Sequence, residues 1–161
     1  FKVKHMMISN VKGSFTNLTG TLTENVKDLL LSQVHASIDI GTVSTGDEQR
    51  DAHLKSADFL DYEQYKEMTF VSTAVEATGK QELAVTGNLT LHGVTKSVTF
   101  SVEGPSSPAV DPWGNTRIGL SATTKINRKD FGLVWNTMLD SGGVLVGEEV
   151  QISLDVQFIK A

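Results

Sequence analysis

The sequence has no cysteine, only three prolines and no long apolar run. Without cysteine there are no disulfides, no thiolate chemistry and no cysteine-ligated zinc sites. No apolar run reaches the ~20 residues that a membrane helix needs, so we expect no membrane span. The formal net charge is −5, which leaves no basic surface of the kind that binds nucleic acid, and we expect none as a partner.

A chain of 161 residues and 17.4 kDa is predicted to form one domain over residues 1–161, large enough to bury a full core. The chain opens on FKVKHMM, which already alternates like a strand, without an initiator methionine or a signal-like apolar block. We expect that an N-terminal segment has been removed, together with any cellular address that it carried.

Apolar residues at every second position run through most of the chain. Because neighbouring side chains of a strand point to opposite faces, each run predicts a strand with one apolar and one polar face. This pattern is typical of antiparallel sheets, and seven or more such strands predict a β-sandwich or a closed barrel. The clearest runs are residues 1–5, 34–40, 83–91, 98–102, 118–126 and 150–158.

Helical signals are few and short. The spacing of Thr45 and Glu48 fits a capping box, which predicts a helix through residues 48–60. In that helix Asp51 and Lys55 lie one turn apart, so we expect them to pair on the solvent side. Shorter helical turns are predicted within residues 25–32 and 135–143.

The segment TGDEQRDAHLKSADF, residues 45–59, is the densest group of charged side chains and the first candidate for an active site. On a helix, Asp51 and His53 lie roughly 200° apart and cannot meet at one metal or substrate. The HExxH spacing is missing. Helix capping and surface pairing are therefore favoured over catalysis.

Other motifs for catalysis fail as well. The sequence has no G-x-S-x-G elbow, no P-loop and no GxGxxG. The remaining histidines, His5, His35 and His92, fall in separate strands or turns, and we predict neither a metal site nor a catalytic residue. Downstream, Arg128 and Asp130 flank a predicted turn, after which Phe131, Leu133 and Trp135 alternate as in an apolar strand.

Four segments together resemble a known family: TGDEQRDAHLKSADFLD, GNLTLHGVTKSVTF, TTKINRKDFGLVW and GGVLVGEEVQISLDV. In type, order and separation they are similar to the YceI-like family of lipocalin-like polyisoprenoid-binding proteins, over about residues 1–158. The resemblance implies an all-β fold, an extended eight-stranded antiparallel barrel with short helical segments, and a periplasmic or secreted location.

One departure concerns the start of the chain. Family sequences usually have a further strand before FKVKHMM, and this chain lacks it. We therefore expect a gap at that edge of the barrel. A partner chain could fill such a gap, so a homodimer stays open as an alternative.

An eight-stranded barrel is just wide enough to be filled by side chains or to hold one ligand. The inward face is predicted to be apolar, and Ala36, Gly87 and Ala122 are small enough to leave volume. The residues predicted to form an apolar lumen are Phe1, Val3, Ile38, Phe70, Leu89, Leu91, Phe100, Leu120, Phe131, Leu133 and Trp135.

The head group of a lipid is expected near the barrel mouth, where an arginine or a neutral histidine can hydrogen-bond a quinone, phenol or phosphate oxygen. The candidates for this polar mouth are Arg50, His53, Asp58, Asn127, Arg128 and Asp130. The alternative interpretation, that each only fixes a turn at a corner of the barrel, is favoured.

The function expected from these observations is non-enzymatic: a protein that carries or sequesters a polyisoprenoid or an isoprenoid quinone, with no cofactor beyond this lipid ligand. A second hypothesis is an enzyme that acts on a lipid or small apolar substrate through His53 with Asp58 or Arg128. A third is a filled barrel that serves only as an interaction module.

Overall fold

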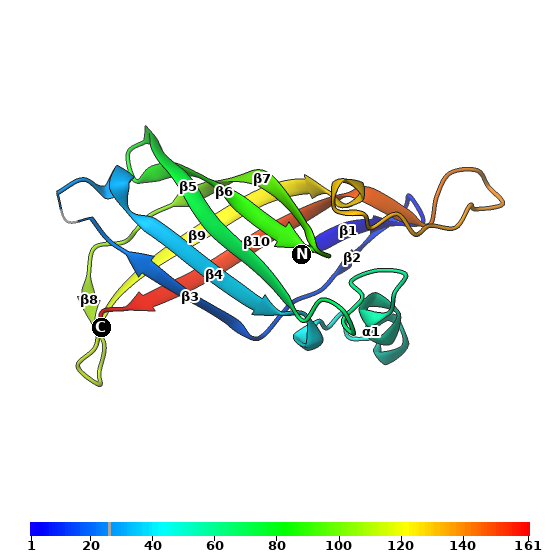
Figure 1. Ribbon diagram of the computed structural model, residues 1–161, viewed down its shortest axis with the longest axis horizontal. Helices are drawn as coiled ribbons and strands as arrows, with labels where there is room; N and C mark the ends of the chain where they lie inside the picture. Colours follow the sequence, from blue (N-terminus) through cyan, green and yellow to red (C-terminus); the bar gives the residue numbers. More distant parts are fainter. Residues whose placement is uncertain (26) are drawn as a thin grey trace.

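The computed structural model describes residues 1–25 and 27–161, and its strands form one curled antiparallel sheet (Figure 1). The predicted all-β, antiparallel, barrel-like fold is confirmed. The strands are β1 (Lys2–His5), β2 (Ser9–Lys12), β3 (Leu18–Thr23), β4 (Gln33–Asp39), β5 (Glu67–Gly79), β6 (Glu82–Leu91), β7 (Val94–Glu103), β8 (Ala109–Val110), β9 (Thr116–Asn127) and β10 (Val146–Ile159). The helical elements are η1 (Leu29–Leu31), η2 (Ile40–Thr42), α1 (Glu48–Lys55) and η3 (Arg128–Phe131).

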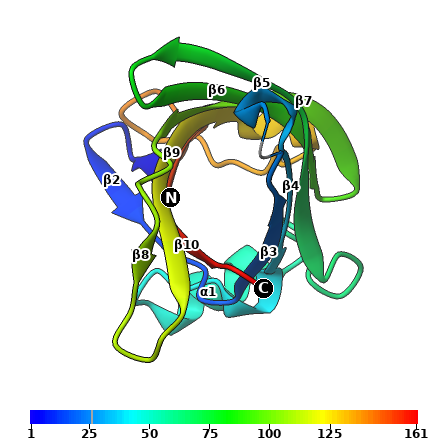
Figure 2. The same ribbon diagram turned by 90° about the vertical axis from the view of Figure 1, so that its left-hand side faces the viewer.

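The sheet has ten strands rather than eight, in the order β2-β1-β10-β9-β7-β6-β5-β4-β3, with β8 paired to β9. The curl brings β3 round towards the C-terminal end of β10, as the end-on view in Figure 2 shows. Among the described residues, no strand pairs with the outer edge of β3 or with the β1 side of β10 beyond Gln151. The ring is therefore not closed by hydrogen bonds at this seam.

The alternation in the sequence becomes two opposite surfaces of the sheet. Across β6, β7, β9 and β10, the register places Leu83, Val102, Ala122 and Leu154 side by side in one apolar row. The neighbouring row, one residue along each strand, is Ala84, Ser101, Thr123 and Ser153. Because the period is two, the first row faces the interior and the second faces solvent.

One end of the curled sheet is filled. Ile40, Leu91, Ile126, Phe131 and Leu133 are all buried and belong to the hydrophobic core. They come from η2, from the ends of β6 and β9, and from η3 with the loop after it, which with α1 lie at the end of the molecule opposite the C-terminus (Figure 1). We call these five residues the plug and this end the plugged end.

The apolar alternation at residues 131–135 does not form the predicted strand. Asn127 caps η3 by accepting a hydrogen bond from the Lys129 backbone, and Gly132 then reverses the chain in the left-handed region at φ 76°. Phe131 and Leu133 consequently enter the core from a short 3₁₀ turn and the loop after it.

The helix at α1 is shorter than predicted and has a different cap. Asp47 rather than Thr45 caps it, through a hydrogen bond from the Arg50 backbone. Asp51 accepts hydrogen bonds from the backbone and hydroxyl of Thr45, so it does not turn outward to pair with Lys55 as predicted.

The two other predicted helical turns are also partly corrected. Of residues 25–32, only Leu29–Leu31 form a 3₁₀ turn, and Val26 lies outside the described residues. Residues 135–143 contain no helix and end in a turn at Gly142 and Gly143, closed by the bridge between Met138 and Val144.

Gly87 makes room for an aromatic ring rather than leaving empty volume as predicted. A Cβ atom at this position would lie 2.4 Å from the Phe70 ring and 2.5 Å from the Val71 carbonyl oxygen. We therefore expect Gly87→Ala to lower the free energy of unfolding by about 1–3 kcal/mol, measured by urea denaturation. Gly119→Ala is the control: its new Cβ meets nothing closer than 3.8 Å, and its stability should stay level or rise slightly. Equal losses in both variants would contradict this account.

Candidate ligand-binding cavity

An apolar cavity of about 430 Å³ lies inside the curl of the sheet. Its wall comes from inward rows on β3–β7, β9 and β10, including Val34, Ala36 and Ile38 of β4 and Leu154, Val156 and Phe158 of β10. Both unpaired edges, β3 and β10, contribute to the lining, so the seam between them forms part of the wall. The volume is within the range of small-molecule sites.

The cavity occupies the part of the interior that the plug leaves free. At its inner end it reaches Ile38, Met68 and Leu89, and none of the five plug residues lines it. At the other end it reaches Leu29 of η1, Pro105 in the loop after β7, and the last inward residue of β10, Phe158. The cavity therefore opens at the end that carries η1, β8 and the C-terminus, which we call the open end (Figure 2).

Of the predicted lumen residues, Ile38, Phe70, Leu89, Phe100 and Leu120 line this cavity. Leu91, Phe131 and Leu133 instead belong to the plug.

The remaining three predicted lumen residues also lie elsewhere. The Phe1 ring packs against Phe15, 5.6 Å between centroids, and Val3 pairs with Val150 at the β1–β10 junction. Trp135 contacts the rings of His53 and Phe59 beside α1. Alternation fixes the face of a strand on which a side chain lies, but not its position along the barrel.

Many lining residues were not selected from the sequence, although the signal for several was present. Val85, Val102, Leu154, Val156 and Phe158 stand in the same alternating runs as the predicted ones and line the cavity. Leu22, Leu29 and Met68 had no such signal, because their runs are short or irregular.

The predicted polar mouth is at the wrong end for this cavity. Within the described part of the chain, none of its six residues lines the cavity. Arg128 is only 3% exposed, and its guanidinium donates hydrogen bonds to the carbonyl oxygens of Leu133, Val146 and Gly147. Burial lowers the pKa of Arg128, and the nearby Glu148 carboxylate opposes this shift.

Arg128 thus ties the loop that supplies the plug to the start of β10. Its neighbours Asn127 and Asp130 stand at the cap and in the first turn of η3. Around α1, His53 Nε2 lies 2.8 Å from Asp58 Oδ2, and Arg50 Nε donates to the Thr45 hydroxyl. These six side chains hold corners of the plugged end, and we do not carry them into the proposed site.

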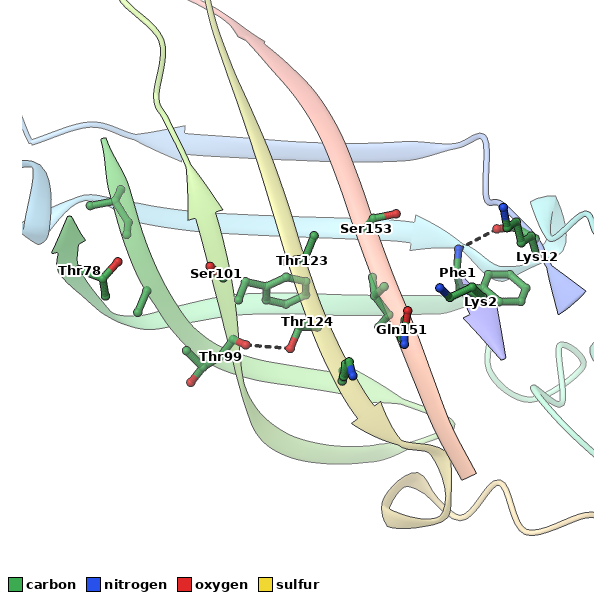
Figure 3. Close-up of a pocket in the computed structure, with 16 residues that line it drawn as sticks. Phe1, Lys2, Lys12, Thr78, Thr99, Ser101, Thr123, Thr124, Gln151 and Ser153 are labelled. Carbon is green, nitrogen blue, oxygen red and sulfur yellow. Dashed lines mark hydrogen bonds between the residues drawn. The ribbon is translucent and has the colours of Figure 1, made fainter. Parts of the chain in front are cut away.

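A second concavity, of about 830 Å³, lies on the outer surface (Figure 3). Its floor is the outward row that includes Ser101, Thr123 and Ser153. Lys2, Lys12 and Lys125 stand at its side, and Lys125 pairs with Glu149 at 3.2 Å. This groove has hydroxyl, lysine and apolar side chains in its lining and is more open to solvent than the interior cavity, so it shelters an apolar ligand less well.

Groupings that would suggest other activities are missing from the described residues. Within residues 1–25 and 27–161, no three His, Cys, Asp or Glu side chains gather in a way that could hold a metal ion. In the same part of the chain, no helix has the length and apolar character needed to cross a bilayer.

Comparison with known sequences decides the family. The YceI-like domain matches residues 1–158. The chain belongs to the YceI-like family. A UPF0312 protein of Pseudomonas putida (strain W619) is 41% identical over 133 residues, which cover 83% of this chain and 69% of that protein. A UPF0312 protein of Staphylococcus aureus (strain MSSA476) is 35% identical over 160 residues, 98% of this chain and 90% of that one.

Solved structures agree with the fold. The YceI protein of Campylobacter jejuni is 28% identical and superposes with a TM-score of 0.81 over 100% of this chain and 91% of that one. Burkholderia cenocepacia BcnA has 23% identity and a TM-score of 0.80, over 98% of this chain and 92% of that one. A polyisoprenoid-binding domain of Saccharophagus degradans has 15% identity and a TM-score of 0.69, over 99% of this chain and 91% of that one. At these last two identities the likeness concerns the fold alone.

The hydrogen bonds of Arg128 predict a specific stability effect. Arg128→Met leaves three carbonyl oxygens without this donor, and we expect the free energy of unfolding to fall by roughly 2–5 kcal/mol. Lys129→Met is the control, since Lys129 pairs with Glu148 on the surface, and it should cost less than about 1 kcal/mol. Urea denaturation measures both, and comparable losses would show that Arg128 does not stabilise the plugged end.

Proposed function

We propose that this protein binds the chain of a polyisoprenoid or an isoprenoid quinone in its apolar cavity, and carries or sequesters that lipid. The observation that carries the proposal is an interior with two parts, the buried side chains of the plug at one end and an apolar cavity at the other. Membership of the YceI-like family supports lipid binding in general.

Hydrocarbon burial is sufficient to drive such binding. Each methylene removed from water contributes about 0.8 kcal/mol, so a five-carbon isoprene unit contributes on the order of 3–4 kcal/mol before costs. Association costs ~4–15 kcal/mol, which a few units offset. Affinity should therefore rise with chain length until the chain reaches the inner end of the cavity at Leu89 and Met68.

The shape of the cavity sets the orientation of the ligand in this proposal. Because the plug seals the inner end, the apolar tail enters first and the head group stays near the open end. Ser32 is a polar lining residue there, while Asp155 and Gln157 reach the lining from the outward face of the edge strand β10. Asp155 accepts a hydrogen bond from Ser121 at 2.6 Å, and Ser32 accepts one from the Asn25 backbone. No cation lines the cavity in the described part of the chain, so selectivity for the head group should be weak.

Binding rather than catalysis is the function that this arrangement supports. The pair His53 and Asp58, which carried the enzyme hypothesis, stands on the surface at α1, where the His53 ring contacts Phe59 and Trp135. A periplasmic or secreted location is part of the proposal and rests on the family resemblance, and a homodimer stays an open alternative to a monomer.

A charge placed in the cavity should abolish binding. Leu120 lines the cavity, and Leu120→Arg puts an unpaired cation among aliphatic side chains, so we expect polyprenol binding to weaken by about a hundredfold or more. Native mass spectrometry of the protein with added polyprenols measures this. Thr123→Arg adds the same charge to the outer face of the same strand and should bind as the wild type does. If both variants retain polyprenol equally, the proposed site is wrong.

A shorter cavity should prefer a shorter chain. Ala36 lies opposite Phe70 in the β4–β5 register and lines the cavity, so Ala36→Phe fills part of it without adding charge. We expect competition between polyprenols of different length to shift towards the shorter ones. His35→Phe, on the exposed face of the same strand, should leave the length preference unchanged. An unchanged preference in Ala36→Phe would show that the chain does not lie along β4.

A further inference from the structure

Exposed apolar side chains surround the open end of the cavity. Leu30 and Leu31 of η1 are 41% and 63% exposed, and Val110 and Trp113, on β8 and the turn after it, are 71% and 81% exposed. Figures 1 and 2 place both segments at the end that carries the C-terminus. We call these four residues the rim.

The turns that present the rim are held in fixed conformations. The Asp111 carboxylate accepts hydrogen bonds from the backbones of Trp113 and Asn115, both at 2.9 Å, and from Arg117 Nε. Desolvation alone would raise the pKa of Asp111, but these hydrogen bonds outweigh it and hold that pKa well below its usual range. At η1, Asp28 accepts a hydrogen bond from the Leu30 backbone at 3.0 Å. These hydrogen bonds fix the two turns, so Trp113 and Leu30 stay exposed to water.

An acidic segment lies at the opposite end. Residues 39–67, from the last residue of β4 to the first residue of β5, include α1 and contain eight acidic and three basic side chains, equal in sum to the formal net charge of −5. The rest of the chain is neutral in sum. Since the open end also carries the carboxylates of Asp28, Asp111 and Asp155, its entry into a bilayer depends on the apolar rim and not on charge attraction.

We propose that the open end docks on a phospholipid bilayer, with the rim entering the headgroup region so that the cavity opens towards the acyl chains. Tryptophan prefers this interface because its ring is apolar and its N–H is polar. The inference rests on the proposed function, since a protein that binds a membrane-dissolved chain must take it from a bilayer. Docking at the mouth lets the chain pass into the cavity without crossing water.

A matched apolar patch exists at the other end and serves as a control. Ile8, in the turn between β1 and β2, is 81% exposed, the same fraction as Trp113. The neighbouring Met6 bonds through its backbone to Leu145, so this turn lies beside the loop before β10, far from the open end in Figure 1.

The direct test uses vesicles of phosphatidylcholine, with and without a minor fraction of phosphatidylglycerol. The sequence has two tryptophans, so Trp135→Phe leaves Trp113 as the single reporter. Its emission should shift to the blue on adding vesicles and be quenched by brominated acyl chains. In flotation assays, the double variant Trp113→Ser with Leu31→Ser should lose about tenfold or more in vesicle partitioning. Ile8→Ser should partition as the wild type does.

Parallel measurements separate this inference from the proposed function. Rim variants should bind a short polyprenol in vesicle-free solution as the wild type does, while taking it up from vesicles more slowly. If the wild-type protein binds polyprenol but does not bind vesicles, the docking proposal is wrong and the proposed function still holds. Protein that floats with vesicles but binds no polyprenol overturns the proposed function. Rim variants that instead abolish self-association in lipid-free buffer would show that a second copy covers the rim, which also overturns the docking.

Discussion

The packing of one end of the barrel is the constraint on which the rest of this structure depends. The inward rows of the sheet are mainly apolar, and without residues that fill one end they would have to pack against one another along the whole interior. Phe131 and Leu133, delivered by η3 and its loop, fill one end together with Ile40, Leu91 and Ile126. These side chains fill that end and exclude water from that side of the interior. The inward rows beyond them can therefore stay apart. The cavity is the space that remains.

The plug in turn depends on a buried arginine. Arg128 donates to three backbone carbonyl oxygens from the loop after η3 and the start of β10. A lysine cannot make this set of bonds, because only the guanidinium group offers several donors in a fixed plane. The charged segment around α1 packs at the same end through His53, Phe59 and Trp135. The polar contacts of Arg128 thus stabilise the plugged end, whereas the cavity is lined mainly by aliphatic and aromatic side chains.

The fold was predictable from the sequence where the argument rested on period-two alternation. The rows through Leu83, Val102 and Leu154 lie on the inner face as expected, and the antiparallel sheet follows from them. The cavity was only partly predictable. Leu89 and Leu91 stand two residues apart on the same face of β6, yet the first lines the cavity and the second lies in the plug. That difference depends on the stagger between strands and on the turn at Gly132, and neither is visible as a local pattern.

The mouth was placed at the wrong end for a related reason. Charged residues near a turn are natural candidates for a binding site in a sequence, but in this structure Arg128, His53 and Asp58 lie at the plugged end. The open end is instead marked by apolar residues outside the long strands, among them Leu31 of η1 and Trp113 in the turn after β8. Such residues are hard to interpret from sequence, because an apolar side chain in a loop gives no periodic signal.

The central claim is that a hydrocarbon chain lies between the inward rows and ends at the plug. Methyl-labelled NMR with an unlabelled polyprenol tests it most directly, through nuclear Overhauser effects between ligand and protein methyl groups. The account predicts contacts from the ligand to Val85, Leu154 and Val156, and none to Leu133 in the plug. Contacts confined to outward side chains such as Ala84 or Thr123, or an undisturbed set of inward methyl groups at saturating ligand, would contradict it.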